Sequence, residues 1–576
     1  MKSLLKKSYF VSLLVAFFIL APLTIVHASD LTAEVTDIEV NKPWTITFNL
    51  PVVESSVNAN SIYVLNSKNE KQVVTSTVKD QVVTIHAPKD GYKYGQSYTL
   101  HVTTDVLGQS GKDIKSLTQS ITKPFTAEKA YVVVTIQKDG TSVPVANFNT
   151  FNEANASLQD HQGIMLNDKY VKIPTGFVAT NTKAVTLIYK EEDFKNEYTG
   201  VTTDTELVYV DATENYVKVK AFGQDMYVKQ EDVTLIPTAA AKGQSYYLAD
   251  EEGLWHHIYH HHRNKKDGAY LIGKKPDFLK KGVKYFSTDG VTFTDESGKI
   301  VGKGLAYFQY LSPRVPTSYS ASQLDAYITS QLTEKEGSGL AKYANASTKS
   351  TIIGLGTTLK TIEKDHRINA LFILSLAIHE SDFGMSCHAQ NYNNLFGLNV
   401  TDTNDTCSTN VDTTSSKYYP SIEANIKALV KKLNTNFLNP LSMQDYRYNG
   451  LALGNKLIGM NVRYASDPYW GAKIAGHLYR IDQALGSKDY KKYAIGFTTQ
   501  KYVSVRTGPV IKNGDNTNRA YQYLPVSAIK QLERMPITLS NTPSETTGWY
   551  RIISELPNGT TDLYTSIDNV RIETTY

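Results

Sequence analysis

The stretch HRINALFILSLAIHESDFG, residues 366–384, decides the fold of the region around it. Its apolar positions are nearly continuous from Ala370 to Ile378, so a helix over this stretch is apolar most of the way round and should be buried. Glu380 stands at the C-terminal end of that helix, shortly before Gly384, a residue type suited to ending a helix. The sequence therefore predicts a core helix with a carboxylate at its end.

Three physical effects act on a carboxylate in that place. Burial disfavours the charged form, the negative end of the helix dipole disfavours it too, and neighbouring Asp382 can add like-charge repulsion. All three raise the pKa of Glu380. A carboxyl that keeps its proton near neutral pH can serve as a general acid toward a glycosidic oxygen. The alternative is an ordinary solvated glutamate at a helix end.

Other helices are predicted on both sides of this one. Ser322 and Asp325 have capping-box spacing and precede an apolar stripe of helical period. A second stripe runs from Ile422 to Phe437, and a third from Ile474 to Leu485. Outside these helices the pattern alternates as in β-strands, for example at Tyr98, Leu100 and Val102. The chain is therefore expected to hold an α-rich domain between β-rich modules.

The length of 576 residues is too great for one ordinary core. With 20% charged and 41% hydrophobic residues the chain is neither disordered nor a membrane protein throughout, and a net charge of +4 argues against a uniformly basic nucleic-acid binder. We expect six segments: 1–28 signal peptide, 29–126 Ig-like β-sandwich, 127–240 β-rich accessory domain, 241–315 strand-rich connecting region, 316–487 catalytic domain and 488–576 C-terminal β module.

The N-terminus predicts export. Lys2, Lys6 and Lys7 precede an apolar run from Val11 to Val26, and small residues place a cleavage site after Ala28. The alternative is a retained membrane anchor. No later segment reaches the length of a membrane span. We therefore expect a secreted protein with no membrane association after removal of the signal peptide.

Cys387 and Cys407 are the two cysteines of the chain. An oxidising exterior allows them one bridge, which closes a loop of about 20 residues and is worth on the order of 3 kcal/mol. Two unpaired thiols are the alternative. Two cysteines cannot form a four-thiolate zinc site.

The segment AIHESDFGMSCHAQNYNNLFGLNV, residues 377–400, carries a family resemblance. It is similar to the signature of the peptidoglycan N-acetylglucosaminidases of bacterial autolysins, glycoside hydrolase family 73. Asn461–Trp470 followed by Lys473–Ala475 looks like the second block of that family, and Ser312–Thr317 resembles its entry segment. The resemblance covers about residues 305–487.

The resemblance implies a lysozyme-like, mainly α catalytic domain that cleaves the β-1,4 bond after N-acetylglucosamine in peptidoglycan, and so a Gram-positive bacterium. It maps the general acid on Glu380 and implies no cofactor. The residues that it implies for substrate binding are Asn393, Asn394, Phe396, Gly397, Tyr464, Asp467 and Trp470.

A second catalytic group is less well defined. A mechanism with paired carboxylates needs another Asp or Glu across the cleft, and the candidates are Asp402, Asp405, Asp412 and Glu423. Each can equally be a solvated loop or first-turn charge. The acetamido group of the substrate can itself act as the nucleophile, so we expect Glu380 to be indispensable and no single second carboxylate to be equally so.

The histidines between His256 and His262 invite a metal interpretation, because His257 and His261 have helical i, i+4 spacing. Aromatic and lysine residues interrupt the patch, so we expect no functional metal site. His379 and Glu380 do not form an HExxH zinc motif, since Phe383 stands where the second histidine belongs.

The C-terminal module resembles bacterial SH3-like domains through Tyr502–Pro509 and Gly548–Tyr550. Such modules bind cell-wall peptide or glycan; the alternative is a purely structural barrel. The whole reading is a secreted, wall-associated peptidoglycan hydrolase. One competitor is a non-catalytic wall-binding or adhesive protein. The other is a peptidase or amidase, which needs a Cys–His pair or a zinc site.

Overall fold

The computed structural model describes residues 34–128, 130–182, 184–400, 406–408, 410–511, 517–523, 534–540, 548–559 and 562–576. The chain divides into two compact units, and each is described by itself. The first comprises residues up to 135 together with 143–169, and the second comprises 136–142 with 170–576. The expected signal peptide lies outside the described residues.

The first unit opens with an Ig-like sandwich, as predicted. One sheet has the order β1-β9-β6-β3, the other β2-β5-β4, and β7 pairs with β8. Tyr98, Leu100 and Val102 of β6 all face the core that the two sheets share, which confirms the predicted alternation. The strands are β1 (Val35–Ile38), β2 (Trp44–Thr47), β3 (Ile62–Asn66), β4 (Thr75–Lys79), β5 (Val82–His86), β6 (Ser97–Val102), β7 (Leu107–Ser110), β8 (Asp113–Ser116) and β9 (Ile121–Ala127).

A small mixed segment follows along the chain. Its four-stranded sheet has the order β11-β10-β12-β13, and a short helix begins at a capping box formed by Thr150 and Glu153. The elements are β10 (Tyr131–Ile136), β11 (Ser142–Phe148), α1 (Phe151–Ala156), β12 (Gln162–Leu166) and β13 (Lys169–Lys172).

The second unit begins with a seven-stranded sheet of the order β16-β15-β19-β18-β17-β14-β20. Alternating apolar residues of β18 and β17 form a core of its own. The strands are β14 (Gly176–Thr180), β15 (Thr186–Tyr189), β16 (Glu197–Val201), β17 (Glu206–Ala212), β18 (Tyr216–Ala221), β19 (Gln224–Lys229) and β20 (Val233–Pro237).

The strand-rich region that follows packs against the helical domain. Its main sheet has the order β23-β22-β21-β24, and β25 pairs with β26. Gly476 of the last long helix lies against β23, where an added Cβ would come within 1.8 Å of the Leu271 carbonyl oxygen. The strands are β21 (Tyr246–Ala249), β22 (Leu254–His260), β23 (Lys265–Gly273), β24 (Lys284–Tyr285), β25 (Thr292–Thr294) and β26 (Ile300–Lys303).

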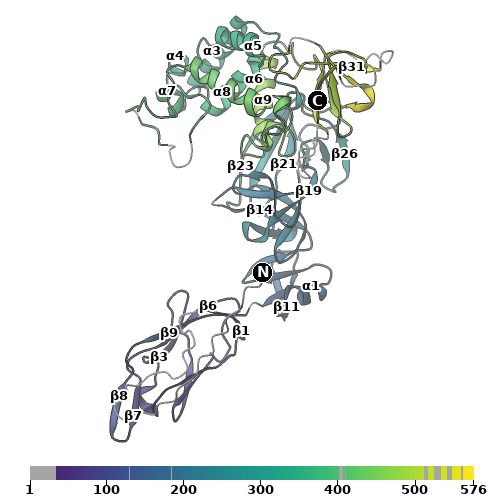
Figure 1. Cartoon of the computed structure of the whole chain (residues 1–576). Coiled ribbons are helices and arrows are strands. Elements are labelled where there is room, and N and C mark those ends of the chain that lie inside the picture. The colour runs from purple at the N-terminus through teal and green to yellow at the C-terminus, as the bar shows by residue number, and fades with distance from the viewer. Residues whose placement is uncertain are drawn as a thin grey trace, which may run out of the picture. The chain divides into compact units, whose positions relative to one another are not determined.

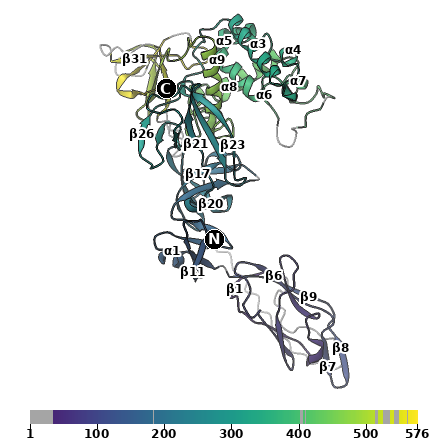
Figure 2. The ribbon, with the colours of Figure 1, turned by 180° about the vertical axis from the view of Figure 1, so that it is seen from behind.

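The helices labelled α3 to α9, all in the second unit, gather into one cluster in both views, and α1, of the first unit, lies beside β11 instead (Figure 1 and Figure 2). The three helices predicted from apolar stripes and the core helix are confirmed. The first of them is capped by Ser320 with Gln323, not by the pair Ser322 and Asp325, so the predicted capping box is wrong by two residues. The helices are α2 (Tyr307–Tyr310), α3 (Ala321–Gly337), α4 (Ala346–Lys349), α5 (Gly356–His366), α6 (Ala370–Ser381), α7 (Cys387–Tyr392), α8 (Ile422–Asn436) and α9 (Trp470–Ala484).

The C-terminal module is a seven-stranded sheet of the order β29-β28-β32-β31-β30-β27-β33. In its described strands no closed barrel is found, so the expected SH3-like barrel is not confirmed. Among the described residues, no helix is both long and apolar enough to cross a membrane. The strands are β27 (Ala494–Thr498), β28 (Ser504–Arg506), β29 (Arg519–Gln522), β30 (Pro536–Leu539), β31 (Trp549–Ile552), β32 (Leu563–Ser566) and β33 (Val570–Ile572).

Candidate active site

Helix α6 places Glu380 at the edge of the helical core. Its N-terminus is fixed by Asn369, whose side-chain oxygen accepts a hydrogen bond of 2.9 Å from the Phe372 N–H. Every residue from Ala370 to Ile378 is buried, as the apolar run predicts, whereas Glu380 in the last turn is only half-buried. The helix therefore holds a carboxylate firmly while leaving it reachable from one side.

Trp470 holds that carboxylate in place. Its indole Nε1–H donates a hydrogen bond of 2.7 Å to Glu380 Oε1. The Tyr464 ring stacks on the indole with centroids 4.5 Å apart, and Phe437 packs edge-on against Tyr464 at 5.3 Å. Trp470 is itself buried, so its indole N–H is shielded from water and donates to the carboxylate instead. The structure thus joins Glu380 to the block at residues 461–470.

The pKa of the Glu380 carboxyl is raised, chiefly by burial. The hydrogen bond from Trp470 opposes this rise, the negative charge of Asp467 adds to it, and the positive charge of Lys432 opposes it. The predicted direction agrees, but one predicted cause does not. Asp382 is held by Lys342 Nζ at 2.7 Å and the Tyr343 hydroxyl at 2.6 Å, so the like charge comes from Asp467.

The block Asn-Asn-Leu-Phe-Gly, residues 393–397, contains both buried and exposed residues. The Asn394 amide is buried, donates to the Leu398 and Lys417 carbonyls and accepts from the Leu398 N–H. Phe396 is also buried, whereas Gly397 is exposed. Asn393 ends α7 in a left-handed conformation and donates to the Tyr419 carbonyl. Asn394 and Phe396 therefore shape the loop from inside.

Of the candidate second carboxylates, the structure describes Asp412 and Glu423. Glu423 pairs with Lys427 at 2.6 Å on the exposed side of α8. Asp412 is exposed and accepts from the Thr414 N–H and hydroxyl. The candidates Asp402 and Asp405 lie outside the described residues.

Asp467 is the acidic residue that the structure brings into the electrostatic environment of Glu380. It pairs with Lys473 Nζ at 2.6 Å and accepts a bond of 2.9 Å from the Tyr469 N–H. The sequence predicted it as a substrate contact. In the structure, the contacts of Asp467 with Lys473 and Tyr469 order the turn before Trp470.

The predicted disulfide between Cys387 and Cys407 is confirmed. It joins the start of α7 to the loop after the Leu-Phe-Gly turn, so both ends of the block are tied together. Since Cys387 is bridged, it has no free thiol to act as the nucleophile of a peptidase.

His256, His257 and His260 lie on strand β22, whereas His261 and His262 lie in the turn after it, so His257 and His261 do not share a helix face. His256 in β22 is buried, contacts the Tyr270 hydroxyl at 2.8 Å and has its pKa lowered to about 3 by burial. His261 contacts Glu206 at 2.8 Å. Within the described ranges no cluster of three or more His, Cys, Asp or Glu side chains could hold a metal ion.

The seven-stranded sheet of β14 to β20 holds the loop that carries Tyr464, a role that the sequence did not predict. The Tyr198 hydroxyl donates to the Leu457 carbonyl at 2.6 Å, and the Thr199 hydroxyl donates to the Val462 carbonyl at 2.7 Å. Arg463 also pairs with Glu197. These bonds join residues more than 250 positions apart, so no local sequence signal could have indicated them.

The same loop contains a buried lysine. Lys456 is 1% exposed, donates to the Ala465 carbonyl, and burial lowers its pKa to about 7. The hydrogen bond from Lys456 to Ala465 joins two ends of the loop to each other, while strand β16 holds the loop through Leu457 and Val462. The loop from 455 to 470 is therefore fixed on two sides before it reaches Trp470.

Comparisons with known proteins find two family models that match parts of the chain. Residues 356–483 match the family described as mannosyl-glycoprotein endo-beta-N-acetylglucosaminidase, and residues 21–127 match a bacterial Ig-like domain. Two curated relatives, from two strains of Streptococcus pneumoniae, are each described as "Putative endo-beta-N-acetylglucosaminidase". Both are 29% identical over 267 residues, which is 46% of this chain but only 34% and 32% of theirs. The matched stretch thus spans about a third of the relatives' length.

Two solved structures are also similar to part of the chain. One is a catalytic mutant of S. aureus autolysin E with the disaccharide NAG-NAM, 16% identical, covering 33% of this chain and 83% of that one, with a TM-score of 0.23. The other is autolysin E with a muropeptide, 16% identical, covering 35% and 87%, with a TM-score of 0.23. At such low scores they carry no argument about the fold.

Proposed function

We propose, from the premise that residues 356–483 form a glucosaminidase-family domain, that this chain hydrolyses the β-1,4 bond after N-acetylglucosamine in peptidoglycan glycan strands. One observation carries the proposal. Glu380 is half-buried, has a raised pKa and accepts a hydrogen bond from the Trp470 indole N–H, while the indole ring stacks with Tyr464. This is the setting that a general acid for a glycosidic oxygen requires.

In the proposed mechanism, Glu380 donates its proton to the leaving glycosidic oxygen as the bond to the anomeric carbon breaks. The acetamido oxygen of the substrate attacks that carbon from the other face and forms a cyclic intermediate. The Glu380 carboxylate then takes a proton from the water that opens this intermediate. The local bonds of Asp412 and the ion pair of Glu423 support a mechanism without a second protein carboxylate.

The location follows from the same proposal. We expect export through residues 1–28 and a site of action at the bacterial cell wall, with the Ig-like sandwich and the C-terminal β module as wall-facing parts. Peptidoglycan glycan strands are the substrate, and wall peptide or glycan is the ligand expected for the C-terminal module.

The test is digestion of purified peptidoglycan by the protein and by Glu380→Gln, with new ends identified by mass after borohydride reduction. We expect reduced N-acetylglucosamine ends from the native protein and a loss of rate of about 10²- to 10⁴-fold in the variant. Reduced N-acetylmuramic acid ends would indicate a muramidase instead. New amines without new reducing ends would indicate a peptidase or amidase.

An adhesive, non-catalytic role is the second candidate. It would be supported by wall binding that is equal in both proteins, with no released products from either. The raised pKa of Glu380 weighs against it, because a carboxyl that only contacts sugar hydroxyls gains nothing from keeping its proton.

A further inference from the structure

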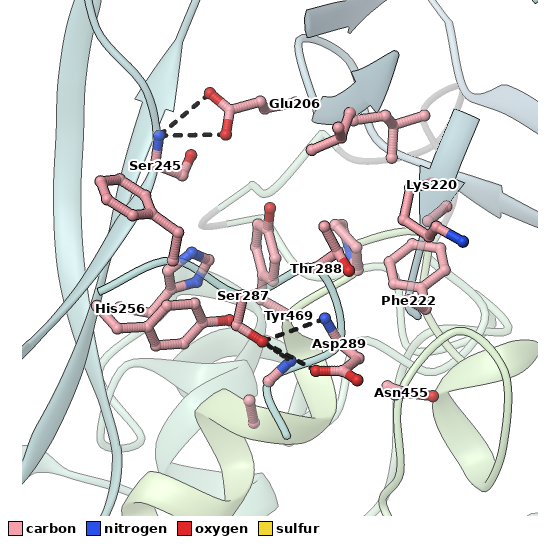
Figure 3. A pocket seen from close by; sticks show the side chains of 18 of the residues that line it. Glu206, Lys220, Phe222, Ser245, His256, Ser287, Thr288, Asp289, Asn455 and Tyr469 are labelled. Carbon is pink, nitrogen blue, oxygen red and sulfur yellow. Dashed lines mark hydrogen bonds between the residues drawn. The ribbon is translucent and has the colours of Figure 1, made fainter. Parts of the chain in front are cut away.

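A cavity in the second unit is lined by residues other than Glu380 (Figure 3). Its volume is about 150 Å³, and its walls come from the seven-stranded sheet, the strand-rich region and the loop before α9. Drug-sized sites hold about 300–1,000 Å³, so this cavity limits its occupant to roughly one ring. Pro468 and Tyr469 line it, directly before Trp470.

The cavity is built from aromatic rings. Tyr469 packs edge-on against His256 with centroids 4.7 Å apart, and Tyr247 stacks flat on His256 at 4.3 Å. Phe177 and Phe222 complete the apolar surface. Such rings offer flat faces to the C–H side of a sugar ring, with polar groups at their edges.

The polar groups of the cavity favour a neutral ligand with hydroxyl groups. Tyr247 and Tyr469 line the cavity, and a phenol hydroxyl can both donate a hydrogen bond to a ligand and accept one from it. Glu206 and Asp289 bring negative charge, and Lys220 is already paired with Asp225 at 2.5 Å. A carboxylate or phosphate ligand would therefore be repelled.

The carboxylates of Glu206 and Asp289 already accept hydrogen bonds from the protein, so they do not need a bound cation. Glu206 accepts from the Ser245 N–H at 3.1 and 3.2 Å and contacts His261 at 2.8 Å. Asp289 Oδ1 accepts from the Ser287 hydroxyl and from the N–H groups of Val291 and Thr292. A hydroxyl group can add a bond to either carboxylate without bringing charge.

The loop that forms one wall is already fixed in place. The three bonds to Asp289 order it from inside, and the Gly290 carbonyl accepts a bond of 3.2 Å from the hydroxyl of Tyr576, the buried last residue. A ligand would thus meet a preformed wall and would pay little ordering entropy on binding.

We propose that this cavity binds a single neutral sugar ring, such as a terminal N-acetylhexosamine, separately from the Glu380 site. The inference goes beyond the proposed hydrolysis and does not depend on it, because binding can be measured in Glu380→Gln. Failure of sugar binding with retained hydrolysis, or the reverse, separates the two proposals.

The test uses the full chain carrying Glu380→Gln, titrated with N-acetylglucosamine by calorimetry and by NMR. Thr288 is exposed and lines the cavity, so Thr288→Trp should fill its mouth and weaken one binding site at least tenfold. Lys299→Trp places the same side chain on an exposed turn away from the cavity and should bind like the parent. Tyr247→Phe, which removes one hydroxyl, should weaken the same site several-fold and guards against misfolding of the tryptophan variant.

N-acetylmuramic acid, whose lactyl group adds a carboxylate, should bind this site at least tenfold more weakly than N-acetylglucosamine. Equal binding by Thr288→Trp and Lys299→Trp would overturn the proposal, since the sugar would then lie elsewhere. Tighter binding of N-acetylmuramic acid, or of the cation glucosamine, would overturn the assignment of a neutral ligand.

Discussion

Trp470 controls Glu380 through a single hydrogen bond, and its removal has a defined sign. The bond from the indole N–H stabilises the ionised carboxylate, so Trp470→Phe should raise the pKa of Glu380 further. The alkaline limb of the pH–rate profile should then move to higher pH. At the same time kcat should fall by about 10- to 100-fold, because the carboxyl loses its positioning.

Asp467→Asn is the matched control for this prediction. Removing its charge takes away an effect that raises the pKa of Glu380 and leaves Lys473 without its ion pair. The alkaline limb should therefore move to lower pH, opposite to Trp470→Phe. If both variants shifted the limb in the same direction, Glu380 would not be the group that titrates in the profile.

Sequence reasoning reached Glu380 because its environment is local. A continuous apolar run and a helix end predict a buried helix with a carboxylate of raised pKa, with a solvated glutamate as the alternative, and the family resemblance adds the role of general acid. The partners of that carboxylate were beyond such reasoning. Trp470 lies 90 positions away, and the choice between Asp382 and Asp467 as the repelling charge depends on Lys342 and Tyr343, which neutralise the first.

At the scale of elements, strand β16 positions the loop that carries Tyr464. The Thr199 hydroxyl is fully buried and donates to the Val462 carbonyl, so Thr199→Val leaves that carbonyl without its partner. The cost is about 1 kcal/mol or more, and part of it falls on the loop two residues before Tyr464. We expect kcat/KM for peptidoglycan to fall about fivefold or more, measured by release of reducing ends.

Thr205→Val provides the comparison for β16. It removes a hydroxyl bond of 2.8 Å to the Thr202 carbonyl within the same module, so it acts on the loop from 455 to 470 only indirectly, through the Thr202 N–H that donates to the Ser466 carbonyl. Its melting temperature should fall about as far as that of Thr199→Val while kcat/KM changes less. Equal losses of kcat/KM in the two variants would show that module stability, not the loop contact, sets the activity.

The elements that sequence periodicity predicted well are those whose packing follows one period. The stripes of α8 and α9 and the alternation of β6 were read correctly. The histidine patch falls in the region predicted to be strand-rich, and the structure places Leu254–His260 on β22, although His257 and His261 alone also fit a helical spacing. Where a stretch fits both the helical and the strand period, the strands that pair with it determine its structure. The sequence does not show which strands these are.

At the scale of the whole molecule, the C-terminal module is joined to the helical domain through buried polar groups. The Arg367 guanidinium donates to the Ser554 and Leu556 carbonyls at 3.1 and 2.8 Å. Between those two residues lies Glu555, 1% exposed. This joint was not predicted, because an isolated glutamate in a β-rich tail has the sequence pattern of a surface residue.

Glu555 makes that joint sensitive to pH. Its Oε2 accepts from the Tyr521 and Tyr523 hydroxyls, while its buried Oε1 has no partner among the described residues. Burial raises the pKa of Glu555 to about 7 from an ordinary value of 4.5. The folded state therefore holds a proton that the unfolded state releases between these values. Stability from this group is full below about pH 4.5 and is lost as the pH rises toward 7, by on the order of 3 kcal/mol.

Glu555→Gln should remove that loss, because a glutamine stays neutral at every pH. Urea unfolding at pH 5.5 and at pH 8 should show a smaller drop in the free energy of unfolding for Glu555→Gln than for the native protein. The exposed Glu423→Gln should keep the native drop. The comparison uses only the difference between the two proteins, because other groups also change stability with pH. Burial lowers the pKa of His379 to about 4 and that of His477 to about 3, so both histidines make the fold more stable as the pH rises toward 6.5. An identical drop in Glu555→Gln and the native protein would mean that this carboxyl is ionised at both pH values, and that the joint between the two modules does not sense pH.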